Sequence, residues 1–322
     1  MLLARRSPVS GIWRQLGLDA LDLVPVANRP LLFHHLEALS KAGVRSVALV
    51  IDARTGREIR STVGDGRAWR LDVNYVDAPE QAGTLDQLRA AEASLDGEPF
   101  IAQRRDVLVR GPIGPLARRF AADGLDALEL ELAPGPDLGL VGMCFLRSEA
   151  LESLAAAEGG LELDGLVADV GAYGGRVSRG YIEGCLPCRG NRELLAANRQ
   201  ILDTIVPCSD RAEIVDSECQ GLVRIGPGAS LYRTLVRGPA SIGAGARLSN
   251  AYIGPYTSIG PGVQIEGAEI EHSIVLPDAE LRYLDARLES SLIGRGARIV
   301  REHNMSRAMR LVVADGAEVT LA

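Results

Sequence analysis

The sequence predicts an α/β fold with a doubly wound, mostly parallel, Rossmann-like sheet, followed by a left-handed β-helix of hexapeptide repeats. Two observations carry this prediction. Strand and helix signals alternate through residues 1–205, as expected for βαβ units. Aliphatic residues then recur at constant spacing through residues 222–300, as expected for a coil with short strands on each side. We therefore expect an α/β domain at 1–205 and a β-helix domain at 206–322.

The α/β half reveals its elements through chain breakers and apolar runs. Pro30 fixes the backbone for a helix start, and Gly43 is typical of a helix end. Val47–Ile51 is an apolar run of the kind found in buried strands. Further helices are expected at 57–63, 84–93 and 191–205, and further strands at 71–76 and from Phe100 onward. This order predicts parallel strands joined by helices.

The second half repeats with a period of 17 residues. The motif Ile225-Gly-Pro-Gly-Ala229 recurs with starts at Ile242 and Ile259, in degraded form at Leu276, and again at Ile293. Two further aliphatic rows contain Leu231, Leu248 and Ile265, and Val236, Ile253 and Ile270. Three rows per turn predict a three-sided coil with glycines at its corners. Residues 301–322 are expected to cap it, with late strands at 311–313 and 319–321.

Composition excludes several classes of partner. The chain has 322 residues and a net charge of −7, with 47% hydrophobic but only 4% aromatic residues. The negative charge argues against nucleic acid or an anionic membrane as the main partner. No apolar run is long enough to cross a bilayer, and no signal peptide precedes the first expected strand. We therefore expect a cytoplasmic protein.

The chain contains one C-x-x-C pair, Cys185 and Cys188, among five cysteines. Without a second pair or a nearby histidine, this spacing is a weak zinc signal. A redox pair normally opens a helix next to a strand. Free thiols are therefore the preferred interpretation.

The opening of the chain resembles a known family. Leu23–Pro30 (LVPVANRP) and the helix after it are similar to the first strand–loop–helix of the sugar-1-phosphate nucleotidyltransferases, in particular the long form of glucose-1-phosphate thymidylyltransferase. Residues 250–260 (NAYIGPYTSIG) and 268–276 (AEIEHSIVL) look like the tail of that family. The resemblance implies a nucleotidyltransferase-like α/β domain, a small-molecule ligand in its cleft, and Mg²⁺ where nucleotide binding is retained.

The phosphate loop of that family is not recognisable here. Counting back from LVPVANRP without a gap places the glycine loop on residues 6–11 and the family's Pro-Lys on Ala20–Leu21. The loop arginine falls on Gly11, so the cation that neutralises the leaving pyrophosphate is missing from its place. Arg5 and Arg6 are displaced cations that either attract phosphate or are ordinary solvated side chains.

Around the expected cleft, further family residues are replaced. The resemblance places the base-reading glutamine on Ala78, the second metal-binding aspartate on Pro187 and a sugar-contacting glutamate on Gly160. The first metal-binding aspartate is retained as Asp106, which is either a Mg²⁺ ligand or an ion-pair partner of its neighbouring arginines. Glu131 begins a candidate remnant of the family's sugar-site motif. The other remnants of the nucleotide and sugar cleft are Gly83, Thr84, Gly142 and Glu162.

The first functional hypothesis is a glucose-1-phosphate thymidylyltransferase homologue whose nucleotide, phosphate and metal site is eroded. Transition-state stabilisation needs several of the missing groups at once, so pyrophosphorylase activity is not expected. The chain would then be repurposed in a biosynthetic pathway, for a different reaction in the old cleft or for a scaffold or regulatory role.

Two alternatives remain open. One is an active nucleotidyltransferase that makes a dTDP-sugar from dTTP and a sugar 1-phosphate, with atypical phosphate binding through Arg5, Arg6 and Asp106. The other is an acyltransferase on the β-helix with His272 as general base. Whether the chain is an enzyme thus stays open. A homo-oligomer formed through the β-helix is expected in each case.

Overall fold

The computed structural model describes residues 21–95, 97–133, 140–154, 162–209 and 211–301, and the backbone of a short strand at 311–312. The chain divides into two compact units. The first comprises Met1–Pro8 and Leu32–Pro187, and the second comprises Val9–Leu31 and Cys188–Ala322. The segment that precedes the first long helix thus belongs with the C-terminal half. The domain boundary expected after residue 205 stays a prediction.

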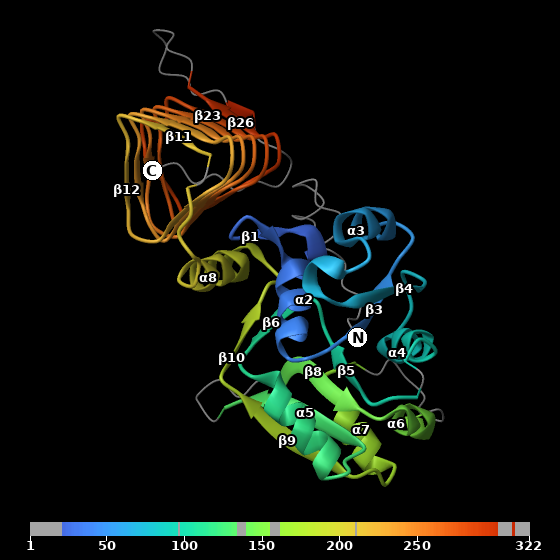
Figure 1. Cartoon of the computed structure of the whole chain (residues 1–322). Helices are drawn as coiled ribbons and strands as arrows, with labels where there is room; N and C mark the ends of the chain where they lie inside the picture. The colour runs from blue at the N-terminus through green and yellow to red at the C-terminus, as the bar shows by residue number, and fades with distance from the viewer. Residues whose placement is uncertain are drawn as a thin grey trace. The chain divides into compact units, whose positions relative to one another are not determined.

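The first unit is an α/β domain, as predicted, with helices around short sheets (Figure 1). Its helices are α2 (Leu31–Lys41), α3 (Gly56–Val63), α4 (Thr84–Glu92), α5 (Ile113–Ala122), α6 (Ser148–Ser153) and α7 (Leu166–Ala172), with a 3₁₀ turn η2 at Arg67–Trp69. Its strands are β3 (Ser46–Ile51), β4 (Asp72–Asp77), β5 (Phe100–Gln103), β6 (Val107–Arg110), β7 (Ala127–Leu132), β8 (Leu140–Leu146), β9 (Val177–Ile182) and β10 (Gly184–Pro187).

Strand pairs in this unit are both parallel and antiparallel. Strands β3 and β4 run parallel, and so do β7 and β9. Strand β8 lies antiparallel between β5 and β7, so that β5 points the same way as β7. Strands β6 and β10 form a separate antiparallel pair. The carboxyl end of β5 leads directly into the turn at 104–106 and then into β6.

The core of the first unit is aliphatic, as the composition requires. Helices α4, α6 and α7 each contribute a leucine that is at most 1% exposed: Leu88, Leu151 and Leu166. They pack in one cluster with small residues of the strands, among them Ala102. This packing fixes β5, and therefore the turn that follows it, against the helical layer.

The second unit contains a β-helix, as predicted. Three sheets form the sides of a coil, visible as a triangular stack in Figure 1. The first side holds β11 (Glu213–Val215), β14 (Ser230–Tyr232), β17 (Arg247–Ser249), β20 (Gln264–Glu266), β23 (Glu280–Arg282) and β26 (Arg298–Val300). The second holds β12 (Glu218–Gln220), β15 (Leu235–Arg237), β18 (Tyr252–Ile253), β21 (Glu269–Glu271) and β24 (Leu288–Glu289). The third holds β13 (Val223–Ile225), β16 (Ala240–Ile242), β19 (Thr257–Ile259), β22 (Ile274–Val275) and β25 (Leu292–Ile293).

The 17-residue period holds in the early coils but is wrong at the degraded repeat. Ile242 pairs with Ile259, as the period predicts. Ile259 then pairs with Val275 rather than with Leu276, and Val275 pairs with Ile293. One coil is therefore a residue short and the next a residue long. The two changes compensate because the buried row, not the residue count, sets the register of stacked strands.

The segment before α2 is a tight hairpin rather than a strand followed by a loop. A 3₁₀ turn η1 (Leu21–Leu23) leads into β1 (Pro25–Val26) and β2 (Arg29–Pro30). Ala27 and Asn28 form the tip, both with left-handed φ. The Asn28 amide donates to the carbonyl and hydroxyl oxygens of Ser241 and to the carbonyl of Ile259, at 2.7–3.1 Å. The conspicuous LVPVANRP motif is thus fastened to the coils.

A second asparagine completes this attachment. Asn198 lies on helix α8 (Asn191–Leu202) and is fully buried. Its Oδ1 accepts the backbone N–H of Ala27 at 2.9 Å and the hydroxyl of Ser258 at 2.7 Å. Its Nδ2 donates to the carbonyl of Tyr256 at 3.1 Å. One side chain therefore joins the hairpin, the helix and the coils.

The C-terminal cap is partly described. Strand β27 (Leu311–Val312) pairs antiparallel with β26, which confirms the late strand expected there. The other late strand, expected at 319–321, lies outside the described residues. Among the residues that the structure describes, no helix is both long and apolar enough to cross a membrane.

Candidate functional site

The candidate site is the turn between β5 and β6, which carries Arg104, Arg105 and Asp106. Asp106 is fully buried. Both of its carboxylate oxygens accept hydrogen bonds from the guanidinium of Arg104: Nε to Oδ1 at 3.0 Å and Nη2 to Oδ2 at 2.9 Å. Such a fork is the strongest form of the arginine–carboxylate pair. Of the two interpretations left open for Asp106, the structure places it in an ion pair.

A second carboxylate approaches the same guanidinium. Nη1 of Arg104 donates to Oδ2 of Asp164, which precedes α7. Burial acts to lower the pKa of Arg104, but the hydrogen bonds and charge of Asp106, with the charges of Asp164 and Glu162, more than offset it and raise that pKa. The cation is therefore permanent. Glu162, predicted as a cleft remnant, is exposed and contributes only through its charge.

Gly142 makes room for the arginine. It lies on β8 with φ of +66°, and its carbonyl accepts the backbone N–H of Arg104 at 2.8 Å. A Cβ at this position would lie 3.0 Å from Cδ of Arg104 and 3.3 Å from its Cβ. The glycine predicted as a remnant of the nucleotide and sugar cleft therefore lies against the arginine stem.

A buried histidine contacts the backbone of the turn. Nδ1 of His35 accepts a hydrogen bond from Nε2 of Gln103 at 2.8 Å, so Nε2–H of His35 donates to the Arg105 carbonyl at 3.0 Å. Burial lowers the pKa of His35 to about 4, although the bond to Arg105 opposes this shift. The neutral ring and the glutamine thus hold the backbone from which Arg104 and Asp106 project.

A divalent metal does not fit the residues at this turn. Mg²⁺ requires oxygen ligands at about 2.1 Å and keeps several waters. Asp106 has no exposed surface, and both its oxygens already face a guanidinium. The position predicted for the second metal aspartate, Pro187, pairs with Val107 across β10 and β6, so the sequence count located the correct neighbourhood. It offers no carboxylate there.

The remaining predicted remnants have structural roles in the first unit. Gly83 is the N-cap residue of α4, and its N–H donates to the carboxylate of Asp86 at 3.3 Å. Thr84 is the first residue of that helix. Ala78, in the place of the base-reading glutamine, packs against the aliphatic core cluster. Three family positions are thus occupied by a helix start and core packing.

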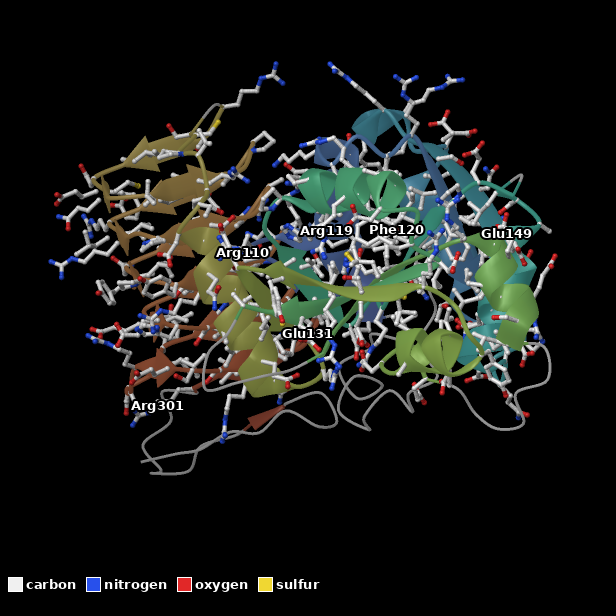
Figure 2. All side chains as sticks on the ribbon, turned by 90° about the horizontal axis from the view of Figure 1, so that it is seen from below. Arg110, Arg119, Phe120, Glu131, Glu149 and Arg301 are labelled. Atoms are coloured by element: carbon white, nitrogen blue, oxygen red, sulfur yellow. The ribbon has the colours of Figure 1, made fainter. Side chains whose placement is uncertain are left out.

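Other predicted residues lie away from the arginine or outside the described residues. Glu131 on β7 pairs with Arg179 on β9 at 3.3 Å (Glu131 is labelled in Figure 2). Arg5, Arg6 and Gly160 fall outside the described residues, as does the segment 6–11 on which the phosphate loop was expected.

Sequence reasoning missed Asp164 and the His35–Gln103 pair. Asp164 is separated from Arg104 by 60 positions, and His35 from Gln103 by 68. Only the local pairing of Asp106 with an adjacent arginine was visible in the sequence. The two arginines directly before Asp106, Arg104 and Arg105, are the signal that pointed to it.

The cysteines and His272 form no recognisable metal or redox site in the described ranges. Cys185 lies on β10 rather than at a helix start, and Cys188 is buried. No group of three metal-binding side chains was found among these residues. His272 sits at a coil corner with φ of +48°, its ring 5.4 Å from that of Tyr256. The acyltransferase hypothesis stays a prediction.

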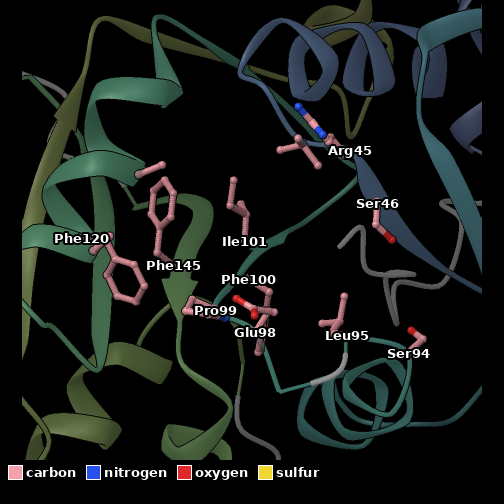
Figure 3. Close-up of a pocket in the computed structure, with 13 residues that line it drawn as sticks. Arg45, Ser46, Ser94, Leu95, Glu98, Pro99, Phe100, Ile101, Phe120 and Phe145 are labelled. Carbon is pink, nitrogen blue, oxygen red and sulfur yellow. The ribbon is translucent and has the colours of Figure 1, made fainter.

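A cavity of about 450 Å³ lies elsewhere in the first unit (Figure 3). Three of the chain's four phenylalanines line it, Phe100, Phe120 and Phe145. It lies at the amino ends of β3 and β5, where Ser46 and Phe100 begin these strands. Ligands of open α/β sheets bind outside the carboxyl ends of strands. The turn at 104–106, and not this cavity, is therefore the candidate functional site.

An α/β unit and a β-helix together define a two-part architecture. A family model described as "Nucleotidyl transferase" matches residues 20–135. Glucose-1-phosphate thymidylyltransferase of Streptomyces griseus is 32% identical over 92% of both chains. The enzyme of that name from Streptomyces antibioticus is 30% identical over 94% of both chains.

More distant similarities agree. A low-salt glycan biosynthesis nucleotidyltransferase of Haloferax volcanii is 25% identical over 93% of this chain and 94% of its own. A solved structure from Bacillus anthracis, assigned as a glucose-1-phosphate thymidylyltransferase in complex with sucrose, has a TM-score of 0.54 at 13% identity, over 63% of this chain and 93% of that one; it bears on the fold alone. The chain belongs to the nucleotidyl transferase family, with full-length similarity to glucose-1-phosphate thymidylyltransferases.

Proposed function

We propose that this chain is a member of the family that no longer makes nucleotide sugars, and that its α/β unit serves a biosynthetic pathway in another reaction or in a scaffold or regulatory role. The observation that carries the proposal is the pairing of both Asp106 oxygens with Arg104. Nucleotidyl transfer needs charge stabilisation of the transferred phosphate. A carboxylate already neutralised by a guanidinium does not bind the metal ion that would provide this charge stabilisation.

A product assay tests this proposal. The protein is incubated with dTTP, glucose 1-phosphate and Mg²⁺, and both pyrophosphate and dTDP-glucose are measured. The Streptomyces griseus relative serves as positive control under the same conditions. We expect no product above the protein-free rate. Product formation that an Asp106→Asn substitution abolishes would establish an active site at this turn and overturn the proposal.

The second candidate is an active thymidylyltransferase with atypical phosphate binding. Its support is the full-length similarity of at least 30% to proteins named for that activity. Calorimetric titration with dTTP in the presence of Mg²⁺ discriminates the two. Magnesium-dependent binding favours this candidate, and absence of binding at millimolar dTTP removes it.

The assembly proposed for the protein is a homo-oligomer through the β-helix. The support is a set of exposed apolar residues on its first coils, 37–42% exposed: Ile214, Val215, Leu222 and Tyr232. Val215 and Tyr232 are neighbours in the stacked strands β11 and β14, and exposed apolar groups that lie together are typical of protein–protein contacts. Sedimentation at micromolar concentration should give a mass above that of one chain, and a monomeric mass contradicts the proposal.

A further inference from the structure

The cation at the turn between β5 and β6 is part of the chain itself. Arg104 lies between Asp106 and Asp164 and is 13% exposed, while the two aspartates are 0% and 27% exposed. A buried carboxylate without a partner is strongly disfavoured, so Asp106 requires a positive charge at this place. The guanidinium provides it through two hydrogen bonds, and a third joins it to Asp164.

Geometry excludes a guanidinium and a divalent ion at the same time. The Arg104 nitrogens lie 2.9–3.0 Å from the two oxygens of Asp106. A divalent ion bound to those oxygens would lie about 2 Å from them, within the space of the guanidinium. The stem of Arg104 has its own place, because Gly142 leaves out the Cβ that would collide with it. The Arg104 side chain therefore has a defined place in the packing next to the carboxylates.

The carboxylates that hold this arginine are also a suitable pair for a metal. Asp106 comes from the turn after β5, and Asp164 comes from the residues before α7. Both reach one guanidinium, so their oxygens converge on one volume. Hard divalent cations prefer such carboxylate oxygens and complete their shell with water, which the partly exposed Asp164 side admits.

We propose that the Arg104 guanidinium is the resident cation of this site in place of a divalent metal ion, and that Asp106 and Asp164 form a latent divalent-cation site that removal of Arg104 uncovers. This inference rests on the proposed function for its meaning, since a chain with a built-in cation has no use for Mg²⁺ at Asp106. The sequence did not suggest Asp164 as a metal ligand. The proposed site includes it.

Mn²⁺ binding tests the inference without any nucleotide. Binding is followed by loss of the free Mn²⁺ signal in electron paramagnetic resonance, and the melting temperature is measured with and without Mn²⁺. The wild-type chain and its Asp106→Asn variant should bind the same amount of Mn²⁺, which means that Asp106 holds no metal in the wild type. The melting temperature of the wild type should not change when Mn²⁺ is added. Mn²⁺ binding by the wild type that is lost in Asp106→Asn overturns the inference.

The variant Arg104→Leu gives the positive arm. It should melt well below the wild type without metal, bind one Mn²⁺ per chain, and regain most of the lost melting temperature when Mn²⁺ is added. The double variant Arg104→Leu/Asp106→Asn should show neither binding nor recovery. A folded Arg104→Leu chain that binds no Mn²⁺ contradicts the inference, and so does an Arg104→Leu chain that fails to fold in the presence of Mn²⁺.

Arg104→Lys is the matched control, because it keeps a positive charge as a point charge without the planar fork. It should fold with an intermediate melting temperature and bind no Mn²⁺. Mn²⁺ binding by this variant would show that a side-chain cation does not exclude the metal, which also contradicts the inference. These readouts are independent of the product assay, so failure here leaves the proposed function to be judged by product formation alone.

Discussion

The hairpin tip at Ala27 and Asn28 and the turn at 104–106 differ in what their side chains bind. At the hairpin, Asn28 and Asn198 bind main-chain groups and hydroxyls of the second unit, with every bond at 3.1 Å or less. At the turn, Arg104 binds two side-chain carboxylates. The first arrangement holds the fold together. The second fills a place where family members are expected to do chemistry.

The difference separates two kinds of family signal. The LVPVANRP motif is recognisable because an asparagine with left-handed φ that binds two stacked coils has few substitutes. Under the proposed loss of the reaction, residues that contact a substrate would be under no such constraint. Asp106 is held in this chain by its pairing with Arg104. A retained motif residue is therefore evidence of chemistry only where its fold contacts do not already explain it.

The largest effect is expected for Asn198→Ala, which breaks the hairpin attachment. The substitution leaves the N–H of Ala27, the hydroxyl of Ser258 and the carbonyl of Tyr256 without their partner in a buried place. We expect a loss of about 4 kcal/mol in the free energy of unfolding. Urea denaturation measures it, and hydrogen exchange should place the added opening in α8 and the adjacent coils. Asn74→Ala, at an exposed asparagine, is the control and should change stability by less than about 0.5 kcal/mol.

The next effect concerns pH and the histidine below the turn. The pKa of His35 is about 4 in the folded chain, against 6.5 for an ordinary histidine. Between these values the unfolded chain binds a proton that the folded chain does not, so stability falls as pH falls. The contribution of the neutral His35 to the free energy of unfolding is fully present above pH 6.5 and is lost by pH 4. The difference is about 3 kcal/mol. Urea midpoints across this window measure it. His35→Gln should remove this part of the pH dependence, and an unchanged slope would contradict the assignment.

The sequence predicted the fold well because the fold depends on local patterns. Aliphatic periodicity gave the coils, and breakers such as Pro30 and Gly43 gave the ends of α2 within two residues. It failed at the degraded repeat, where Val275 and not Leu276 enters the row. One deleted residue and one added residue cancel over two coils, and a constant period cannot show such a compensation.

The candidate site was predictable only in part. The count from the family motif placed Pro187 beside the Asp106 turn, which β6 and β10 confirm. The contact of Asp164 with Arg104 could not be predicted, because it depends on the path of the chain that leads into α7 and not on spacing in the sequence. The contact of Gly142 with Arg104 was also not predictable, because a glycine in the sequence indicates that a side chain is excluded but not which neighbour excludes it.

Asn28→Gly sharpens the comparison at the hairpin by separating backbone from side chain. Glycine keeps the left-handed φ of +62° without strain, so the loss reports the three hydrogen bonds to Ser241 and Ile259. We expect a loss of about 2 kcal/mol in thermal or urea unfolding. Asn28→Ala should cost about 1 kcal/mol more, because alanine adds backbone strain. Equal losses in the two variants would mean that backbone strain contributes nothing at this position and that the side-chain hydrogen bonds alone determine the residue.

The smallest effect is the excess cost of a side chain at Gly142, which a comparison with a second glycine isolates. Alanine at either Gly142 or Gly43 meets a left-handed φ, of +66° and +88°. A Cβ at Gly43 has no atom within 4 Å, whereas one at Gly142 lies 3.0 Å from Cδ of Arg104. Gly43→Ala should therefore cost only the backbone strain of about 1 kcal/mol, and Gly142→Ala about 1 kcal/mol more. In the background of Arg104→Leu with Mn²⁺, the excess should shrink, because leucine makes no hydrogen bonds to the aspartates and its side chain can turn away from residue 142. An excess that persists in that background would place the collision with another part of the chain, and the seat assigned to Arg104 would need a different explanation.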